Sequence, residues 1–279
     1  MQVESDVAKN YSQLLRLAQH GGELPRRRGL VTALRDAGAM LPNESVGDII
    51  LGYRNKLTAR GAVVIGSTAF AAYSNALGLT DVPKSMSATN DVDVAFQRTA
   101  AMVGPPQTLA NAESRSKGLG QASVDFVTPR LPGEPESGEG LQHFAWIQRL
   151  KTYAYMLPAD RSLLITKPMD AVIVHNAGVL VQMPDPVRYA LHKLAIAPSR
   201  ANVEKRQKDS EQATLLLQDA ARRHPAKLQS LLGEFVAYGN GVLAQPLMSG
   251  LEKCNSTDPV FQAWRQDAIQ HTLAPALRR

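Results

Sequence analysis

The chain has 279 residues and a mass of 30.2 kDa, enough for one catalytic domain with helical additions or for two small domains. Lysine and arginine number 31 against 25 aspartate and glutamate, a modest net charge of +6 at pH 7. The sequence has no uninterrupted apolar run of about 18 residues, and its start lacks the pattern of a secretory signal, so we expect a cytoplasmic protein without membrane association. A single cysteine excludes an internal disulfide and a cysteine zinc cluster.

Residues 1–60 are predicted to form an N-terminal helical segment. Helical spacing of apolar residues covers 3–20, 29–40 and 44–59. Gly21-Gly22 and the run Pro25–Arg28 separate the first two of these helices.

A catalytic domain is predicted over residues 61–183, and it begins with a strand-to-helix turn. Ala62–Ile65 is a short β-branched run, and Gly66-Ser67 then opens an apolar helical stretch. Glycine lets the backbone approach a phosphate, Ser67 can cap the helix or bind an oxygen, and the helix N-terminus attracts anions. An ordinary turn with a capping serine has the same pattern, so this feature alone leaves both interpretations open.

The segment that follows carries two acidic residues at strand spacing. Side chains alternate along a strand, so Asp91 and Asp93 share one face while Val92 takes the other. Crowded carboxylates repel one another unless a cation lies between them, although Asp-x-Asp can also be a solvated strand face. Ser123–Val127 repeats the apolar and acidic pattern around Asp125. If the two strands are neighbours, the three carboxylates converge on a patch suited to two-metal phosphoryl chemistry.

The rest of the domain alternates between loop and strand signals. Residues 129–140 are rich in proline and glycine and form a loop, either a lid over the site or an idle connection. Further strands are predicted at 143–147, 163–166, 171–174 and 178–183, the last pairing with its predecessor. Strands and helices in this order predict an α/β (α+β) fold, a mixed sheet flanked by helices.

The segment 184–279 is predicted to be a C-terminal helical domain. The candidate helices cover 185–196, 200–223, 225–237, 241–253 and 258–277. On the first of these, Tyr189 and Lys193 lie four residues apart and share a face.

The order of Gly66-Ser67, Asp91-x-Asp93 and Asp125 resembles the nucleotidyltransferase fold of the DNA polymerase β-like superfamily. The block from Met183 to Leu194, with Arg200 and Lys208-Asp209 after it, resembles a bacterial group of uncharacterised nucleotidyltransferase-fold proteins and, more distantly, AbiE-type toxin nucleotidyltransferases. The resemblance covers roughly residues 60–220. Between Ser67 and Asp91 lie 23 residues, more than in compact members, and the excess maps to a loop over 78–86.

This resemblance implies a set of roles. Asp91, Asp93 and Asp125 are the catalytic residues and the ligands of two Mg²⁺ ions, with Mn²⁺ as the alternative. The nucleotide-binding residues are Gly66, Ser67, Lys193, Arg200 and Lys208. The implied reaction moves a nucleoside monophosphate from an NTP to an acceptor hydroxyl and releases pyrophosphate.

The acceptor stays open at this point. Residues 1–60 carry nine basic against six acidic residues, and 188–227 carry nine against four, whereas 61–187 are slightly acidic. Basic segments around an acidic centre favour a polyanion such as RNA, above all tRNA, while a protein or small-molecule acceptor fits the core equally. The chain could instead be a non-catalytic nucleotide-binding or regulatory protein. A toxin role with a cognate antitoxin, or an antitoxin or interaction module built on the C-terminal helices, also stays open.

Overall fold

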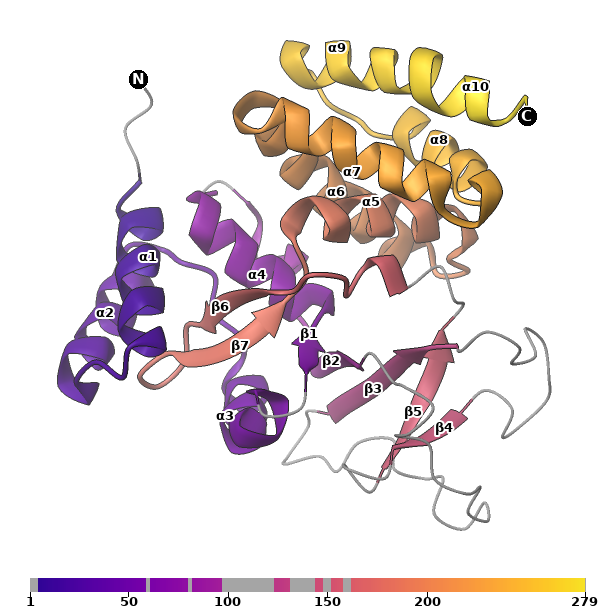
Figure 1. Cartoon of the computed structure of the whole chain (residues 1–279). Coiled ribbons are helices and arrows are strands. Elements are labelled where there is room, and N and C mark those ends of the chain that lie inside the picture. Colours follow the sequence, from indigo (N-terminus) through magenta and orange to yellow (C-terminus); the bar gives the residue numbers. More distant parts are fainter. Residues whose placement is uncertain are drawn as a thin grey trace. The chain divides into compact units, whose positions relative to one another are not determined.

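The structure is a computed structural model that describes residues 5–58, 61–79, 82–96, 123–130, 144–147, 152–157 and 162–278. The chain divides into two compact units, Met1–Pro184 and Asp185–Arg279. Figure 1 shows the strands in the first unit and the helices of the second. Within the described ranges, no helix combines the length and hydropathy that a membrane span needs.

A five-stranded mixed sheet forms the centre of the first unit (Figure 1). Its strands are β1 (Ala62–Val64), β2 (Asp91–Phe96), β3 (Ser123–Pro129), β5 (Thr152–Leu157) and β4 (Phe144–Ile147), in this spatial order. The pairs β2–β3 and β3–β5 are parallel, whereas the outer pairs β1–β2 and β4–β5 are antiparallel. The predicted mixed sheet flanked by helices is therefore confirmed.

The register of the sheet follows from the alternation of apolar and acidic residues. Val92 and Val94 are buried on one face of β2, and Val94 lies opposite Val64 of β1. Asp91 and Asp93, which alternate with these valines, are thereby held on the other face.

The helices α1 (Asp6–Gln19) and α2 (Leu24–Asp36) lie side by side next to a hairpin of β6 (Met169–Ile173) and β7 (Val179–Met183), as Figure 1 shows. Tyr11 of α1 accepts a hydrogen bond from the backbone N–H of Val172 at 3.1 Å, and burial raises the pKa of its hydroxyl far above the usual range. Arg27 of α2 donates to the backbone oxygens of Ala177 at 2.8 Å and Gly178 at 2.5 Å. Side chains therefore tie both helices to the hairpin backbone.

Two further helices, α3 (Glu44–Thr58) and α4 (Gly66–Leu77), accompany the sheet. A short 3₁₀ turn, Lys84–Met86, lies in the link between α4 and β2, where a loop is predicted.

Three local predictions are wrong. The arginine run that was expected to separate two helices lies inside α2, because Pro25 occupies the first turn, where its missing N–H costs no helical hydrogen bond. Residues 163–166 form a turn and not a strand, closed by a bond from Ile165 N to Ser162 O at 3.2 Å. Leu164 and Ile165 are nevertheless buried, which explains the strand-like apolar signal. The third wrong prediction is an omission, because the sequence pattern did not predict strand β5.

Some predicted features fall outside the described residues. Most of the loop at 129–140 and the first residue of the strand at 143–147 are among them. The pairing of the last two predicted strands is confirmed by the antiparallel β6–β7 hairpin.

The second unit is helical in every described element. Its α-helices are α5 (Pro186–Ile196), α6 (Val203–Arg223), α7 (Pro225–Ala237), α8 (Ala244–Glu252), α9 (Pro259–Asp267) and α10 (Ala274–Ala276). A six-residue π-helix, Ala268–Leu273, joins α9 to α10 and interrupts the long last helix that the sequence predicts. Asp185 caps α5 by accepting hydrogen bonds from Val187 N at 2.9 Å and Arg188 N at 3.4 Å.

Asn75 provides a test of the buried polar contacts in the first unit. Its side chain is buried in α4 and exchanges two hydrogen bonds with the backbone of Met40, at 2.7 and 2.8 Å. Asn75→Ala leaves both backbone groups of Met40 unpaired, and we expect a loss of about 2–4 kcal/mol in the free energy of unfolding. Chemical denaturation measures this loss. The control Asn255→Ala, at an exposed site, should change stability by less than about 0.5 kcal/mol; equal effects of the two would contradict the assignment.

Candidate active site

The structure brings Asp91, Asp93 and Asp125 together on one face of the sheet. β2 and β3 are parallel neighbours, and Asp93 lies directly opposite Asp125 in their register. Each of the three offers a carboxylate oxygen, and these oxygens lie within 4.8 Å of one another. All three residues are half-buried, so they are held by the sheet yet remain open to a ligand.

The segment that leads into β2 is anchored by a residue that the sequence did not single out. Asn43 caps α3 by accepting a hydrogen bond from Val46 N at 2.8 Å. Its amide nitrogen donates to Thr89 O at 2.7 Å and to Asn90 Oδ1 at 2.9 Å, and the Thr89 hydroxyl in turn donates to Asp91. The position of the first carboxylate therefore depends on the start of α3. An asparagine directly before a helix is a capping signal, but its contact across 46 residues leaves no local pattern.

Gly66 lies against the second carboxylate. Its φ is +69°, a backbone conformation that favours glycine, and a Cβ placed there would overlap the Asp93 carboxylate. Ile65, the residue directly before Gly66, donates its backbone N–H to Asp93 O at 2.9 Å. The turn after β1 is thus packed directly onto the acidic strand.

Of the two roles that the sequence leaves open for Ser67, capping of the helix is contradicted by the structure. Ile65 holds the N-cap position of α4, without a side-chain hydrogen bond, and Gly66 is the first helical residue. Ser67 is consequently the second residue of α4, and it is half-buried. A serine at this place is a candidate oxygen-binding group, not a cap.

The donor set of the three aspartates suits a hard divalent cation. Mg²⁺ and Mn²⁺ prefer carboxylate oxygens, and two or three such oxygens within a few ångströms are the usual protein contribution. The trio can therefore hold a metal ion of this class.

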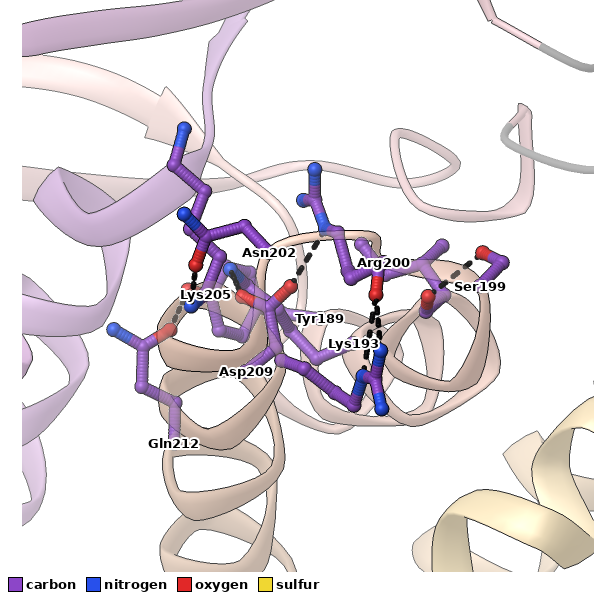
Figure 2. Close-up of polar contacts among 10 residues, drawn as sticks. Tyr189, Lys193, Ser199, Arg200, Asn202, Lys205, Asp209 and Gln212 are labelled. Carbon is purple, nitrogen blue, oxygen red and sulfur yellow. Dashed lines mark hydrogen bonds and ion pairs between the residues drawn. The ribbon is translucent and has the colours of Figure 1, made fainter.

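The cationic candidates lie in the second unit, where two of them share one carboxylate. Asp209 of α6 accepts from Lys193 Nζ and, at 3.0 Å, from Arg200 Nε (Figure 2). The exposed fractions of the side chains are 6% for Asp209, 10% for Lys193 and 42% for Arg200. Lys193 and Asp209 thus form a buried ion pair, whereas Arg200 reaches the same carboxylate from the surface. Lys208, which precedes Asp209, is half-buried on α6.

The surroundings of Lys193 are fixed by α5. Tyr189, one turn earlier, has its ring centre 5.4 Å from Lys193 Nζ, within the range of a cation–π contact. The Tyr189 hydroxyl donates to Gln212 Oε1 at 2.9 Å. The predicted shared face of Tyr189 and Lys193 is confirmed, but the ammonium group of Lys193 is directed into this network.

Arg200, unlike Lys193, has part of its charged group available to a ligand. Figure 2 shows its terminal guanidinium nitrogens directed away from Asp209. Its backbone oxygen accepts two bonds from Arg206, at 3.2 and 2.7 Å, which hold the turn before α6 in place. A guanidinium with one edge anchored and the other open is suited to bind an anion such as phosphate.

The chain matches a known protein family over most of the region described above. A nucleotidyltransferase family model matches residues 53–112 and 105–236, which overlap and together cover more than half of the chain. The chain belongs to the nucleotidyltransferase family. All eight candidate residues of this nucleotidyltransferase lie inside the matched segments. The family implies an NTP as substrate and transfer of its NMP part as the reaction class. No curated protein and no solved structure shows significant similarity to the chain.

Gly66 of the nucleotidyltransferase can be tested by the smallest substitution. In Gly66→Ala the added methyl group collides with the Asp93 carboxylate and the φ of +69° becomes strained. A displacement of about 1 Å at a reacting centre costs about 10²-fold in rate, so we expect a loss of that size in NMP transfer. Gly233→Ala, at an exposed position in α7 with open space around it, serves as control and should keep full activity. Equal activity of the two variants would rule out the close packing of Gly66.

Asp209 of the nucleotidyltransferase can be tested through stability. Asp209→Asn removes the partner of the buried Lys193 charge, and removing one member of such a pair costs about 3–5 kcal/mol. Asp267→Asn, in an exposed pair with His271, should cost less than about 0.5 kcal/mol. Chemical denaturation distinguishes the two. A small effect of Asp209→Asn would mean that Lys193 finds another partner.

Proposed function

We propose that the chain is a Mg²⁺-dependent nucleotidyltransferase of the DNA polymerase β-like superfamily that moves an NMP from an NTP to a hydroxyl of RNA, above all a tRNA end. The observation that carries this proposal is the cluster of Asp91, Asp93 and Asp125 on two parallel strands, with Gly66 packed against it. A turn that tolerates a phosphate next to three metal-binding oxygens is what transfer from a triphosphate needs.

Asp91 and Asp93 are the residues that would hold the ions, and Asp125 completes the ligand set. When bound, Mg²⁺ neutralises phosphate oxygens and makes an acceptor hydroxyl more acidic. In this proposal Asp125 also accepts the proton of that hydroxyl, and its position on the neighbouring strand, opposite Asp93, supports this role.

The phosphates of the NTP are assigned to Gly66, Ser67, Arg200, Lys193 and Lys208. Gly66 lets the backbone approach, and Ser67 offers a hydroxyl in the first turn of α4. In the second unit Arg200 is the strongest candidate, because its outer edge is open. Lys193 neutralises Asp209, which leaves the positive charge of Arg200 available to a phosphate, and Lys208 is the adjacent cation on α6.

An RNA acceptor is preferred over a protein or a small molecule because of charge. The segments 1–60 and 188–227 are basic, whereas the part that carries the trio is slightly acidic. Basic segments that flank an acidic segment in the sequence favour a polyanion as the acceptor. The crowding of three carboxylates also argues against a nucleotide-binding protein without turnover, because such a protein gains nothing from their repulsion.

Incubation of the purified chain with each α-labelled NTP, Mg²⁺ and total RNA or lysate tests the proposal. We expect label in RNA, dependence on Mg²⁺ or Mn²⁺, and loss of transfer with a chelator. Label in protein or in a small molecule would contradict the RNA acceptor. A lack of label with all four NTPs would contradict the catalytic assignment. Co-purification of a neighbouring small protein that blocks transfer would support a toxin role with a cognate antitoxin.

Substitution of the acidic trio gives the sharpest prediction. Asp91→Asn and Asp93→Asn should lower NMP transfer by at least about 10²-fold, because each removes a metal-binding charge. The melting temperature should stay the same or rise, since each substitution relieves repulsion between carboxylates. Asp36→Asn, at the exposed end of α2, is the matched control and should transfer normally. Undiminished transfer by either trio variant would overturn its assignment.

A further inference from the structure

Four arginines lie on two helices of the first unit, α2 and α3, that flank the β6–β7 hairpin turn (Figure 1). Arg26, Arg27 and Arg28 lie in the first turns of α2, and Arg54 lies near the end of α3. We call them the α2–α3 arginine cluster. Arg54 is close enough to Arg27 that its charge, after the larger effect of burial, helps to lower the pKa of Arg27. Two of these charges, on different helices, therefore lie near one another.

The hairpin turn holds the two helices in this arrangement. It lies between α2 and α3 in Figure 1. On the α2 side, Arg27 donates to the backbone oxygens of Ala177 and Gly178. On the α3 side, His175 bonds Asp48 at 2.9 Å and packs directly against Gly47. Arg27 is therefore anchored to the hairpin backbone.

The other three members are exposed to solvent. Arg26, Arg28 and Arg54 are all exposed. α2 contains four arginines and a single carboxylate, Asp36, which is its last residue. The acidic residue of α3 closest to the hairpin, Asp48, is already engaged by His175. Within α2, four arginines against one aspartate leave a surplus of three positive charges.

Arginine is also the residue type that fits phosphate best. Its guanidinium is planar, always charged and able to form two parallel hydrogen bonds to one phosphate group. Several arginines spaced over two helices match the repeated charges of a nucleic-acid backbone, from which counterions are released on binding.

The cluster is connected to the catalytic sheet through α3. The first turn of α3 is capped by Asn43, which also holds the residues before Asp91. Near its other end, the ring of Tyr53 lies 6.4 Å from the ring of Phe126, the neighbour of Asp125 in β3. Arg54 follows Tyr53 directly. One helix of about 22 Å thus links the acidic site and the arginines.

We propose that the α2–α3 arginine cluster binds the phosphate backbone of the RNA whose end accepts the NMP. This inference rests on the proposed function for the identity of the polyanion. The cluster contributes to binding of the acceptor RNA and not to the transfer step, because none of its members belongs to the acidic trio.

RNA binding by the variant Arg26→Gln/Arg28→Gln/Arg54→Gln tests the proposal. The probe is a fluorescent single-stranded oligoribonucleotide with a free 3′ hydroxyl, titrated at several salt concentrations. We expect binding at least ~10-fold weaker than wild type at 50 mM salt, and a plot of log affinity against log salt that is shallower by about 2, the value for three lost phosphate contacts on a single strand. Arg27 is left in place because it bonds the hairpin backbone.

Two further variants separate charge from structure. Lys167→Gln/Lys253→Gln/Arg278→Gln removes the same charge at exposed positions elsewhere and should bind RNA with nearly the wild-type salt dependence. Arg26→Lys/Arg28→Lys/Arg54→Lys retains the charge and should restore the slope. If the control weakens binding as much as the glutamine variant, or if the glutamine variant binds normally, the proposal fails. Binding of the cluster to anionic phospholipid vesicles but not to the RNA probe would also overturn it.

The transfer assay distinguishes this failure from failure of the proposed function. In the glutamine variant the KM for RNA should rise about 10-fold, while kcat and the KM for the NTP stay unchanged. Label transfer to RNA that is insensitive to the arginines would overturn the inference and leave the proposed function intact. Absence of transfer to RNA by the wild-type chain would overturn the acceptor assignment, and the binding titration would still decide whether the cluster binds RNA.

Discussion

Parallel pairing of β2 with β3, with Asp93 opposite Asp125, is the constraint on which the candidate active site depends. Side chains alternate along a strand, so a slip by one residue would move a carboxylate to the buried face, where Val92 and Val94 now pack. The apolar residues therefore determine the position of the acidic ones. The antiparallel β1 then places Gly66 against Asp93, so that the register of three strands sets the geometry of the whole site.

The second unit is organised around a different constraint, a buried carboxylate with two cationic partners. Burying Lys193 and Asp209 removes the hydration of both charges, and only close pairing with additional hydrogen bonds offsets that loss. Arg200 supplies the second contact to Asp209 from the surface. The network thus links the interior of the helical unit to a solvent-exposed guanidinium, and the stability of α5 and α6 is coupled to the position of that group.

Local patterns predicted much of this fold and site. The alternation around Asp91 and Asp93 and the turn at Gly66 follow from backbone geometry, so both can be predicted from the sequence. Pro25 was misleading, because proline ends a helix in its interior but is tolerated in its first turn. The apolar residues at 163–166 are buried in a turn, and burial alone does not distinguish a strand from a turn. The role of Asn43 could not be predicted, since it depends on contact between residues far apart in the chain.

The double use of Asp209 has a consequence for how the cations of the second unit respond to a ligand. If a phosphate draws Arg200 away, the carboxylate keeps Lys193 and no buried charge is left alone. Moving Arg200 therefore costs little free energy. Moving Lys193 would leave Asp209 as a buried charge without its close partner, which is strongly destabilising. Asp209 thus holds one cation that stays in place, Lys193, and one that can move, Arg200. The helical unit can therefore adjust to a ligand while its core stays packed.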